Sequence, residues 1–319
     1  MRRSDFDVID KVRTTDPIEV GGEVARLYLD LYQGKKSRSI ERAFRDISRL
    51  YQGKDPGFQP CDTEYHDIQH VLDVTLTMAR LLDGYERGRN GSAPLPSAYF
   101  SLGVISALFH DFGYLRRRSD RKHRFGAEYT LKHVSRGSHF LRGYLPRAGL
   151  KKYAAQGAQL VHFTGYERNV DSIRMDDPML RRVGEVLGTA DIIAQMSDRC
   201  YLEKCRDRLY PEFVLGGLTR RKLPDGNTIT VFTSGSDLVH KTPGFYLNAM
   251  KRLDHQLDRA YVYADKCFGG QNPYLEEMQK SVRYAETMAS ARANGALRRT
   301  PPSTLLPTVR PYPEDLVIT

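Results

Sequence analysis

The chain has 319 residues, of which 40% are hydrophobic and 28% are charged, a composition typical of a folded globular protein. No apolar run approaches the roughly 20 residues that a membrane-crossing helix needs. The N-terminal segment MRRSDFDVID lacks the apolar centre of a signal peptide, so we expect a cytoplasmic protein. The net charge of +10 favours anionic partners, but no motif typical of nucleic-acid recognition accompanies it.

Helical periodicity dominates the chain. In residues 37–52, for example, apolar side chains recur at spacings of three and four, which indicates an amphipathic helix. The same reasoning predicts a helix from about Tyr65 to Leu82 and another in the very apolar segment that follows Ser97. Further helices are expected at 125–144, 150–164, 178–210, 244–266 and 274–294.

One stretch argues for β-structure. Residues 220–235 combine an Asp-Gly turn with a β-branched run, which predicts a small hairpin inserted into a helical body. The end of the chain is rich in proline and cannot form a regular helix over most of its length. We therefore expect a helical domain over 1–295, with its core at 61–210, and a C-terminal tail over 296–319.

The four cysteines are scattered and form no CxxC pair, which predicts ordinary thiols instead of a zinc–thiolate site. The polar residues that call for an explanation are histidines and aspartates. In LFHDFGY, His110 and Asp111 end the apolar run VISALF, which must lie in the core. Burying this pair is costly unless hydrogen bonds or a cation compensate. A divalent metal would satisfy both, because neutral imidazole and carboxylate are its ordinary ligands.

Two other predicted helices carry similar residues. YHDIQH places His66 and His70 four residues apart, so they share one face at the start of a buried helix. In VGEVLGTADIIAQM, Asp191 borders the buried stripe and directs a carboxylate inward. Each residue alone is more often a satisfied structural group than a ligand. Together, on three separate helices, they predict a metal site.

The order H…HD…D resembles the HD superfamily of metal-dependent phosphohydrolases. More closely, YHDIQHVLDV and ALFHDFGY resemble two signature motifs of the class I cyclic nucleotide phosphodiesterases. This resemblance covers residues 61 to about 200 and implies an all-α, HD/PDEase-like helical bundle. It implies that the metal ligands are His70, His110, Asp111 and Asp191. His66, which counts as catalytic together with Asp111, would protonate the leaving oxygen, and Asp73 would orient a ligand.

The chain also departs from the phosphodiesterase signature. Asp67 stands where the family has Asn, and Tyr114 stands where it has a further histidine. For a second metal or its waters, the loosely matching candidates are His123, His162 and Glu128, each of which is also explained as a surface or core-edge residue. Phosphate oxygens could be held by the basic side chains that follow the HD pair, unless these form a solvated loop: Arg118, Lys122 and Arg124.

The predicted function is that of a metal-dependent phosphohydrolase using one or two divalent ions (Mn, Mg, Zn or Fe). The expected substrate is a small anionic phosphate ester, first a phosphodiester such as a cyclic nucleotide, attacked by a metal-bound hydroxide. No membrane or nucleic-acid partner is expected, and a homodimer is left open. One alternative is a nucleotide phosphomonoesterase or pyrophosphohydrolase. Another is a degenerate domain that binds a nucleotide or a protein without catalysis.

Overall fold

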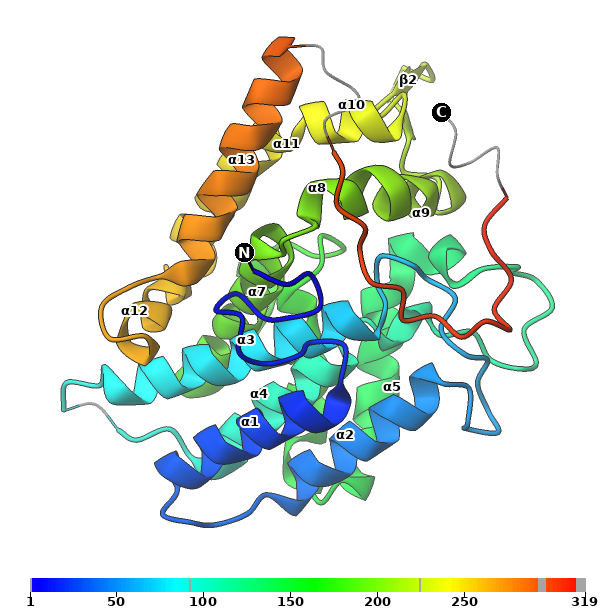
Figure 1. The fold of residues 1–319 in the computed structure, drawn as a ribbon. Helices are drawn as coiled ribbons and strands as arrows, with labels where there is room; N and C mark the ends of the chain where they lie inside the picture. Colours follow the sequence, from blue (N-terminus) through cyan, green and yellow to red (C-terminus); the bar gives the residue numbers. More distant parts are fainter. Residues whose placement is uncertain (1, 92, 224, 292–296, 314–319) are drawn as a thin grey trace.

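The computed structural model describes residues 2–91, 93–223, 225–291 and 297–313, and helices make up most of it (Figure 1). The predicted all-α fold with a small hairpin is confirmed. The α-helices are α1 (Pro17–Leu31), α2 (Arg38–Tyr51), α3 (Ile68–Arg87), α4 (Ser97–Phe109), α5 (His133–Arg147), α6 (Ala154–Leu160), α7 (Pro178–Ser197), α8 (Tyr201–Lys204), α9 (Tyr210–Leu215), α10 (Gly235–His240), α11 (Thr242–His255), α12 (Tyr263–Cys267) and α13 (Pro273–Ala291).

Short helical turns join these helices. They are the 3-10 turns η1 (Phe112–Tyr114), η2 (Gly126–Lys132), η3 (Lys151–Tyr153), η4 (Val161–Phe163), η5 (Val170–Ser172) and η7 (Ala260–Val262), and the π-helical turn η6 (Cys205–Leu209). Among the described residues, no helix has the length and apolar character needed to cross a membrane.

Helix α3 is the centre of the fold. It packs against α1, α4, α7 and α12, and nearly all its residues from Gln69 to Gly84 are buried. The helix begins at Ile68, three residues later than predicted, because the Asp67 side chain accepts a hydrogen bond from the His70 N–H and caps the first turn. His66 therefore lies just before the helix, and His70 lies within its first turn.

Two glycines let α5 approach the turn that follows α4. A Cβ on Gly113 would lie 1.8 Å from the His133 carbonyl oxygen, and a Cβ on Gly137 would lie 2.9 Å from the His110 carbonyl oxygen. Only glycine permits such close packing of one backbone on another. The start of α5, with His133, is thereby held against the His110–Asp111 turn.

Two predicted helices are interrupted. The helix expected over 178–210 starts at the Asp177 cap and Pro178, but α7 ends at Ser197, because Asp198 adopts an extended backbone. The helix expected over 244–266 ends at His255, because Asp258 and Arg259 have positive φ angles. Helices α1 and α10 were not predicted.

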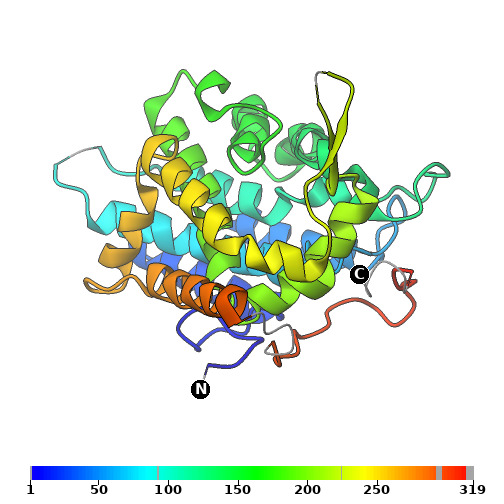
Figure 2. The same ribbon diagram turned by 90° about the horizontal axis from the view of Figure 1, so that it is seen from above.

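The hairpin and the C-terminal segment lie on the outside of the helical body (Figure 2). Strands β1 (Arg220–Lys222) and β2 (Thr228–Thr230) pair antiparallel, and all six residues are exposed. Residues 297–313 run along the surface, where Thr304 donates to Asp67 and Arg208 donates to the carbonyls of Pro301 and Pro302. Tyr312, near the end of this segment, is buried.

Candidate metal centre and active site

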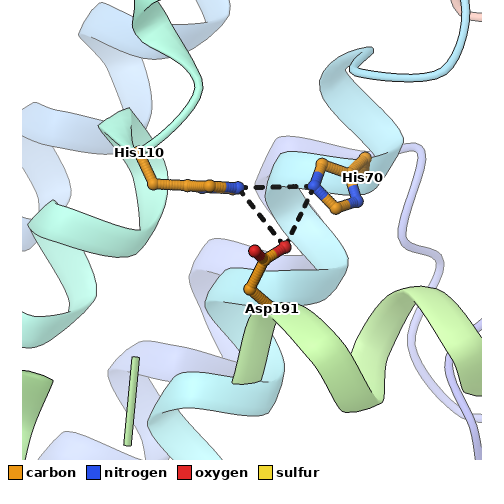
Figure 3. Close-up of side chains that lie close together, drawn as sticks. All are labelled: His70, His110 and Asp191. Atoms are coloured by element: carbon orange, nitrogen blue, oxygen red, sulfur yellow. Dashed lines mark hydrogen bonds and ion pairs between the residues drawn. The ribbon is translucent and has the colours of Figure 1, made fainter. Parts of the chain in front are cut away.

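Three helices bring His70, His110 and Asp191 together (Figure 3). His70 lies on the first turn of α3, His110 directly follows α4, and Asp191 lies on α7. The two Nε2 atoms are 3.3 Å apart, and Asp191 Oδ1 lies 3.5 Å from His70 Nε2 and 3.8 Å from His110 Nε2. These atoms converge on one point between the helices.

Asp111 adds a second carboxylate to this cluster. Its Oδ2 lies 3.2 Å from His70 Nε2 and 3.1 Å from His110 Nε2, yet it is buried and has no hydrogen-bond partner. Ligand atoms bound to one ion at about 2.0–2.2 Å lie about 3.0–3.5 Å from one another. The spacing and the unpartnered buried oxygen both fit a divalent cation held by four predicted residues.

His110 is held in the tautomer that a metal ligand requires. Its Nδ1 donates to the Ala107 carbonyl oxygen at 2.7 Å, which leaves the Nε2 lone pair facing the cluster in the neutral ring. Burial by itself lowers the pKa of His110, but the Asp111 and Asp191 carboxylates outweigh burial and raise the pKa to about 9. The histidines in turn hold the pKa of Asp111 well below its usual range, against the effect of burial. The cluster thus concentrates negative charge that a cation would neutralise.

His66 is paired with Glu212, a residue that the sequence analysis missed. His66 Nδ1 lies 2.5 Å from Glu212 Oε2, and the fully buried Glu212 also accepts from the Tyr65 N–H at 2.7 Å. Burial lowers the pKa of His66, but the Glu212 and Asp111 carboxylates outweigh it and raise the pKa. With Nδ1 engaged by Glu212, Nε2 is the nitrogen left to act in the adjoining cavity.

His133 is a second missed residue. The Tyr114 ring stacks with both His66 and His133, at 4.4 Å from each ring centroid, and the two imidazole centroids are 6.2 Å apart. His133 Nδ1 donates to the Thr130 carbonyl oxygen at 2.6 Å, and His133 Nε2 lies 3.5 Å from Asp111 Oδ1. Tyr114, which stands where the phosphodiesterase signature has a histidine, therefore supports two rings of the site. A second cation could be held between His133 and Asp111.

The three predicted candidates for a second metal lie elsewhere. His123 Nδ1 is 3.2 Å from Asp120 Oδ2, and Glu128 Oε1 accepts from two backbone N–H groups, those of Arg124 and Phe125. Buried His162 has an unpartnered Nδ1, and burial lowers its pKa to about 4. None of the three belongs to the cluster, and none lines the cavity into which it opens.

The predicted phosphate-binding residues also lie outside. Arg118 is exposed and donates to the Gly53 carbonyl oxygen at 2.7 Å, while Lys122 and Arg124 are exposed on the same loop. The cluster opens instead into a cavity of about 810 Å³, and these three residues are not among those that line it. Its polar wall is formed by His66, His70, Asp111, Tyr114, His133, Asp191 and Gln195.

Asp73 does not line this cavity either, although the resemblance to the phosphodiesterase signature implies that it orients a metal ligand. Burial, together with the negative charges of Asp198 and Asp7, raises its pKa to about 7. The charged groups that act on Asp73 include Lys204 and Arg2, and no hydrogen bond links it to His70. Asp67, the other unexplained residue of the motif, is the cap of α3.

Comparisons with known proteins agree with the helical architecture. No protein-family model and no curated protein matches the chain. Two solved structures of the phosphodiesterase domain of rhodopsin phosphodiesterase from the choanoflagellate Salpingoeca rosetta match it with a TM-score of 0.54 and 14% identity. The match covers 91% of this chain and 92% or 96% of theirs. At this identity the likeness establishes a shared fold.

The chain thus has the helical fold of these phosphodiesterase domains. Within that fold it carries a His-His-Asp cluster that could bind a metal ion.

Proposed function

We propose that the protein is a divalent-metal-dependent phosphohydrolase that cleaves a phosphodiester. The observation that supports this most is the pairing of two units on one cavity wall. One unit is the cluster of His70, His110, Asp111 and Asp191, and the other is the His66–Glu212 pair. A cation site beside a positioned proton donor is the arrangement that phosphoester hydrolysis requires.

The side chains would divide the chemistry as follows. A bound cation would polarise phosphate oxygens and lower the pKa of water. Glu212 holds Nδ1 of His66, so Nε2 can donate a proton to the leaving oxygen as the ester P–O bond breaks. A water oxygen forms the new bond to phosphorus and releases a proton, so one diester and one water yield a phosphomonoester and an alcohol.

The charge of the cavity favours a diester over a monoester or a pyrophosphate. Apart from histidines, the cationic side chain among the described lining residues is Lys241. Its ammonium group is already paired, because Nζ donates to Asp237 Oδ2 at 2.8 Å and to the Val231 carbonyl oxygen at 2.7 Å. A diester carries a single negative charge, so it needs less neutralisation than a dianionic monoester.

The first diester class to test is suggested by the resemblance of YHDIQHVLDV to the cyclic nucleotide phosphodiesterase signature. The test is hydrolysis by purified, metal-depleted protein to which Mn²⁺, Mg²⁺, Zn²⁺ or Fe²⁺ is returned. The panel contains cyclic mononucleotides, simple dialkyl phosphates and phosphomonoesters. Metal-dependent hydrolysis of diesters, with monoesters much slower, is expected. Monoester turnover without diester turnover would contradict the proposal.

Two variants separate the proposed roles. His66→Asn should retain the metal content of the wild type and lose activity by roughly 10²–10⁴-fold, as expected when a general acid is removed. Asp191→Asn should lose both metal and activity, because it weakens a ligand. The metal content of each variant, measured by mass spectrometry, distinguishes a proton donor from a metal ligand. If His66→Asn also lost its metal, His66 would be a ligand.

A further inference from the structure

One part of the cavity wall is apolar, in contrast to the polar part that carries the cluster. It is supplied by one stretch of chain, from η6 through α9 and the base of the hairpin to α11 (Figures 1 and 2). The apolar side chains that line the cavity from this stretch are Leu209, Phe213, Leu218, Val231, Phe232, Leu238 and Phe245. Phe213 and Phe232 contact each other, with ring centroids 5.7 Å apart. The cavity is therefore polar on one side and apolar on the other.

The charged groups near this apolar wall already have partners. Lys241 is paired with Asp237, and Glu167 accepts from the N–H groups of Val134 and Ser135. Burial raises the pKa of Cys205 to about 12, so its thiol stays neutral. The uncharged polar side chains that line the cavity from this stretch are Thr242 and Asn248 of α11. Apart from them, this wall offers dispersion contacts to a ligand and little that would recognise the hydrogen-bonding edge of a nucleobase.

Large apolar side chains also lie at the entrance of the cavity, together with exposed Lys241 and Asn248. Three of the apolar lining residues remain well exposed to solvent: Tyr166 at 72%, Leu131 at 66% and Phe245 at 36%. Large apolar groups that gather at the rim of a cavity mark a surface that a ligand covers. They extend the apolar wall outward, so a ligand group longer than the cavity itself would still contact hydrocarbon.

We propose that the substrate is an amphiphilic phosphodiester whose hydrocarbon group, an alkyl chain or a plain aryl ring, lies on this apolar wall while its phosphate lies at the cluster. This inference rests on the proposed function, because it assigns the substrate class of the same site. The cavity volume of about 810 Å³ suits such a molecule, since pockets of roughly 300–1,000 Å³ hold ligands of drug size.

The test is a homologous series of methyl n-alkyl phosphates, from ethyl to decyl, used below the concentration at which they form micelles. Each buried methylene stabilises binding by about 0.8 kcal/mol, so kcat/KM should rise about three- to four-fold per methylene until the wall is covered. Between ethyl and hexyl the rise should be on the order of 100-fold. Methyl phenyl phosphate shows whether a ring is preferred to a chain.

Matched variants locate the effect on the structure. Phe245→Ser and Leu131→Ser remove exposed lining groups and should reduce the hexyl-to-ethyl ratio by about five-fold or more. Leu247→Ser is the control, because Leu247 is 62% exposed on the same helix as Phe245 but does not line the cavity. Its ratio should equal that of the wild type.

Failure of this inference can be distinguished from failure of the proposed function. Hydrolysis that is independent of chain length, or faster hydrolysis of 3′,5′-cyclic AMP than of the hexyl ester, would overturn this inference and leave the proposed function intact. Absence of hydrolysis of every diester with every metal would overturn the proposed function and this inference with it.

Discussion

Asp111 presents its two carboxylate oxygens to different histidines. Oδ2 lies near His70 and His110, while Oδ1 lies 3.5 Å from His133 Nε2. His133 has the same arrangement as His110, with Nδ1 donating to a backbone carbonyl and Nε2 left for a ligand. A carboxylate placed in this way can bridge two cations.

We therefore predict that His133→Asn loses one of two metal equivalents. Wild-type protein titrated with Mn²⁺ should bind two ions, and the variant should retain the tighter one held by the main cluster. The measurement is isothermal titration calorimetry together with metal analysis. His123→Asn is the matched control, because His123 pairs with Asp120 outside the cavity, and its stoichiometry should not change. Two equivalents in His133→Asn would show that His133 is structural.

These residues also show what sequence alone can reveal about a site. His70, His110, Asp111 and Asp191 were predicted together because each is a polar group in an apolar helical pattern. Glu212 and His133 gave no such signal. Glu212 approaches His66 across 146 residues of chain, and only packing of α9 near the start of α3 brings them together. His133 stands among polar neighbours and resembles a surface residue until Gly113 places it at the HD turn.

At the scale of elements, the start of α3 positions His70, the first of the proposed metal ligands. Asp67 Oδ1 accepts from the His70 N–H at 2.9 Å, and Asp67 Oδ2 accepts from the Thr304 hydroxyl at 2.6 Å. One carboxylate therefore caps the helix and also fastens the C-terminal segment to it. Asn, which the phosphodiesterase signature has at this position, can cap a helix equally well, but its amide nitrogen could not also accept from Thr304.

Asp67→Ala should lower the free energy of unfolding by roughly 1–3 kcal/mol, because it removes the cap and the partner of Thr304. Asp67→Asn should lose less than half as much, since its amide oxygen can still cap the helix. Chemical denaturation of both variants measures the difference. Equal losses would mean that the hydrogen bond from Thr304 of the C-terminal segment matters more than the cap.

Helix positions were predicted more accurately than helix ends. The apolar patterns of α2, α3, α4 and α13 are long and regular, so their positions follow from the sequence. The breaks after Ser197 and His255 depend on tertiary contacts. The Asp198 carboxylate, for instance, pairs with Lys204 at 2.6 Å, and Lys204 also donates to Gln69 of α3 at 2.9 Å. Local patterns cannot show such a contact.

At the scale of the whole molecule, a buried polar network joins distant parts of the chain. Asp7 in the N-terminal segment pairs with Arg80 of α3, and Arg80 also donates to the Tyr274 hydroxyl of α13 at 3.1 Å. Lys204 links Asp198 to Gln69 of α3. The network fastens both ends of the fold to the central helix, and no sequence pattern predicted it.

Asp73 is the member of this region that should make global stability depend on pH. Its folded-state pKa of about 7 lies above the value of 3.8 that is usual for an aspartate. The folded protein therefore binds a proton that the unfolded chain releases, and this contribution to stability is complete below about pH 4. It is lost as the pH rises toward 7, at up to about 1.4 kcal/mol per pH unit.

Asp73→Asn mimics the protonated carboxyl group at every pH. The difference in unfolding free energy between the variant and the wild type should therefore shift in favour of the variant from pH 4 to pH 8, by on the order of a few kcal/mol. Asp198→Asn should show no such slope, because Lys204 and the Cys200 N–H outweigh burial and lower the pKa of Asp198. Its carboxylate is therefore ionised in both the folded and the unfolded chain above about pH 5. Denaturation curves at four pH values between 4 and 8 provide the comparison. A pH-independent difference for Asp73→Asn would mean that this carboxyl group is solvated and ionised in the folded protein.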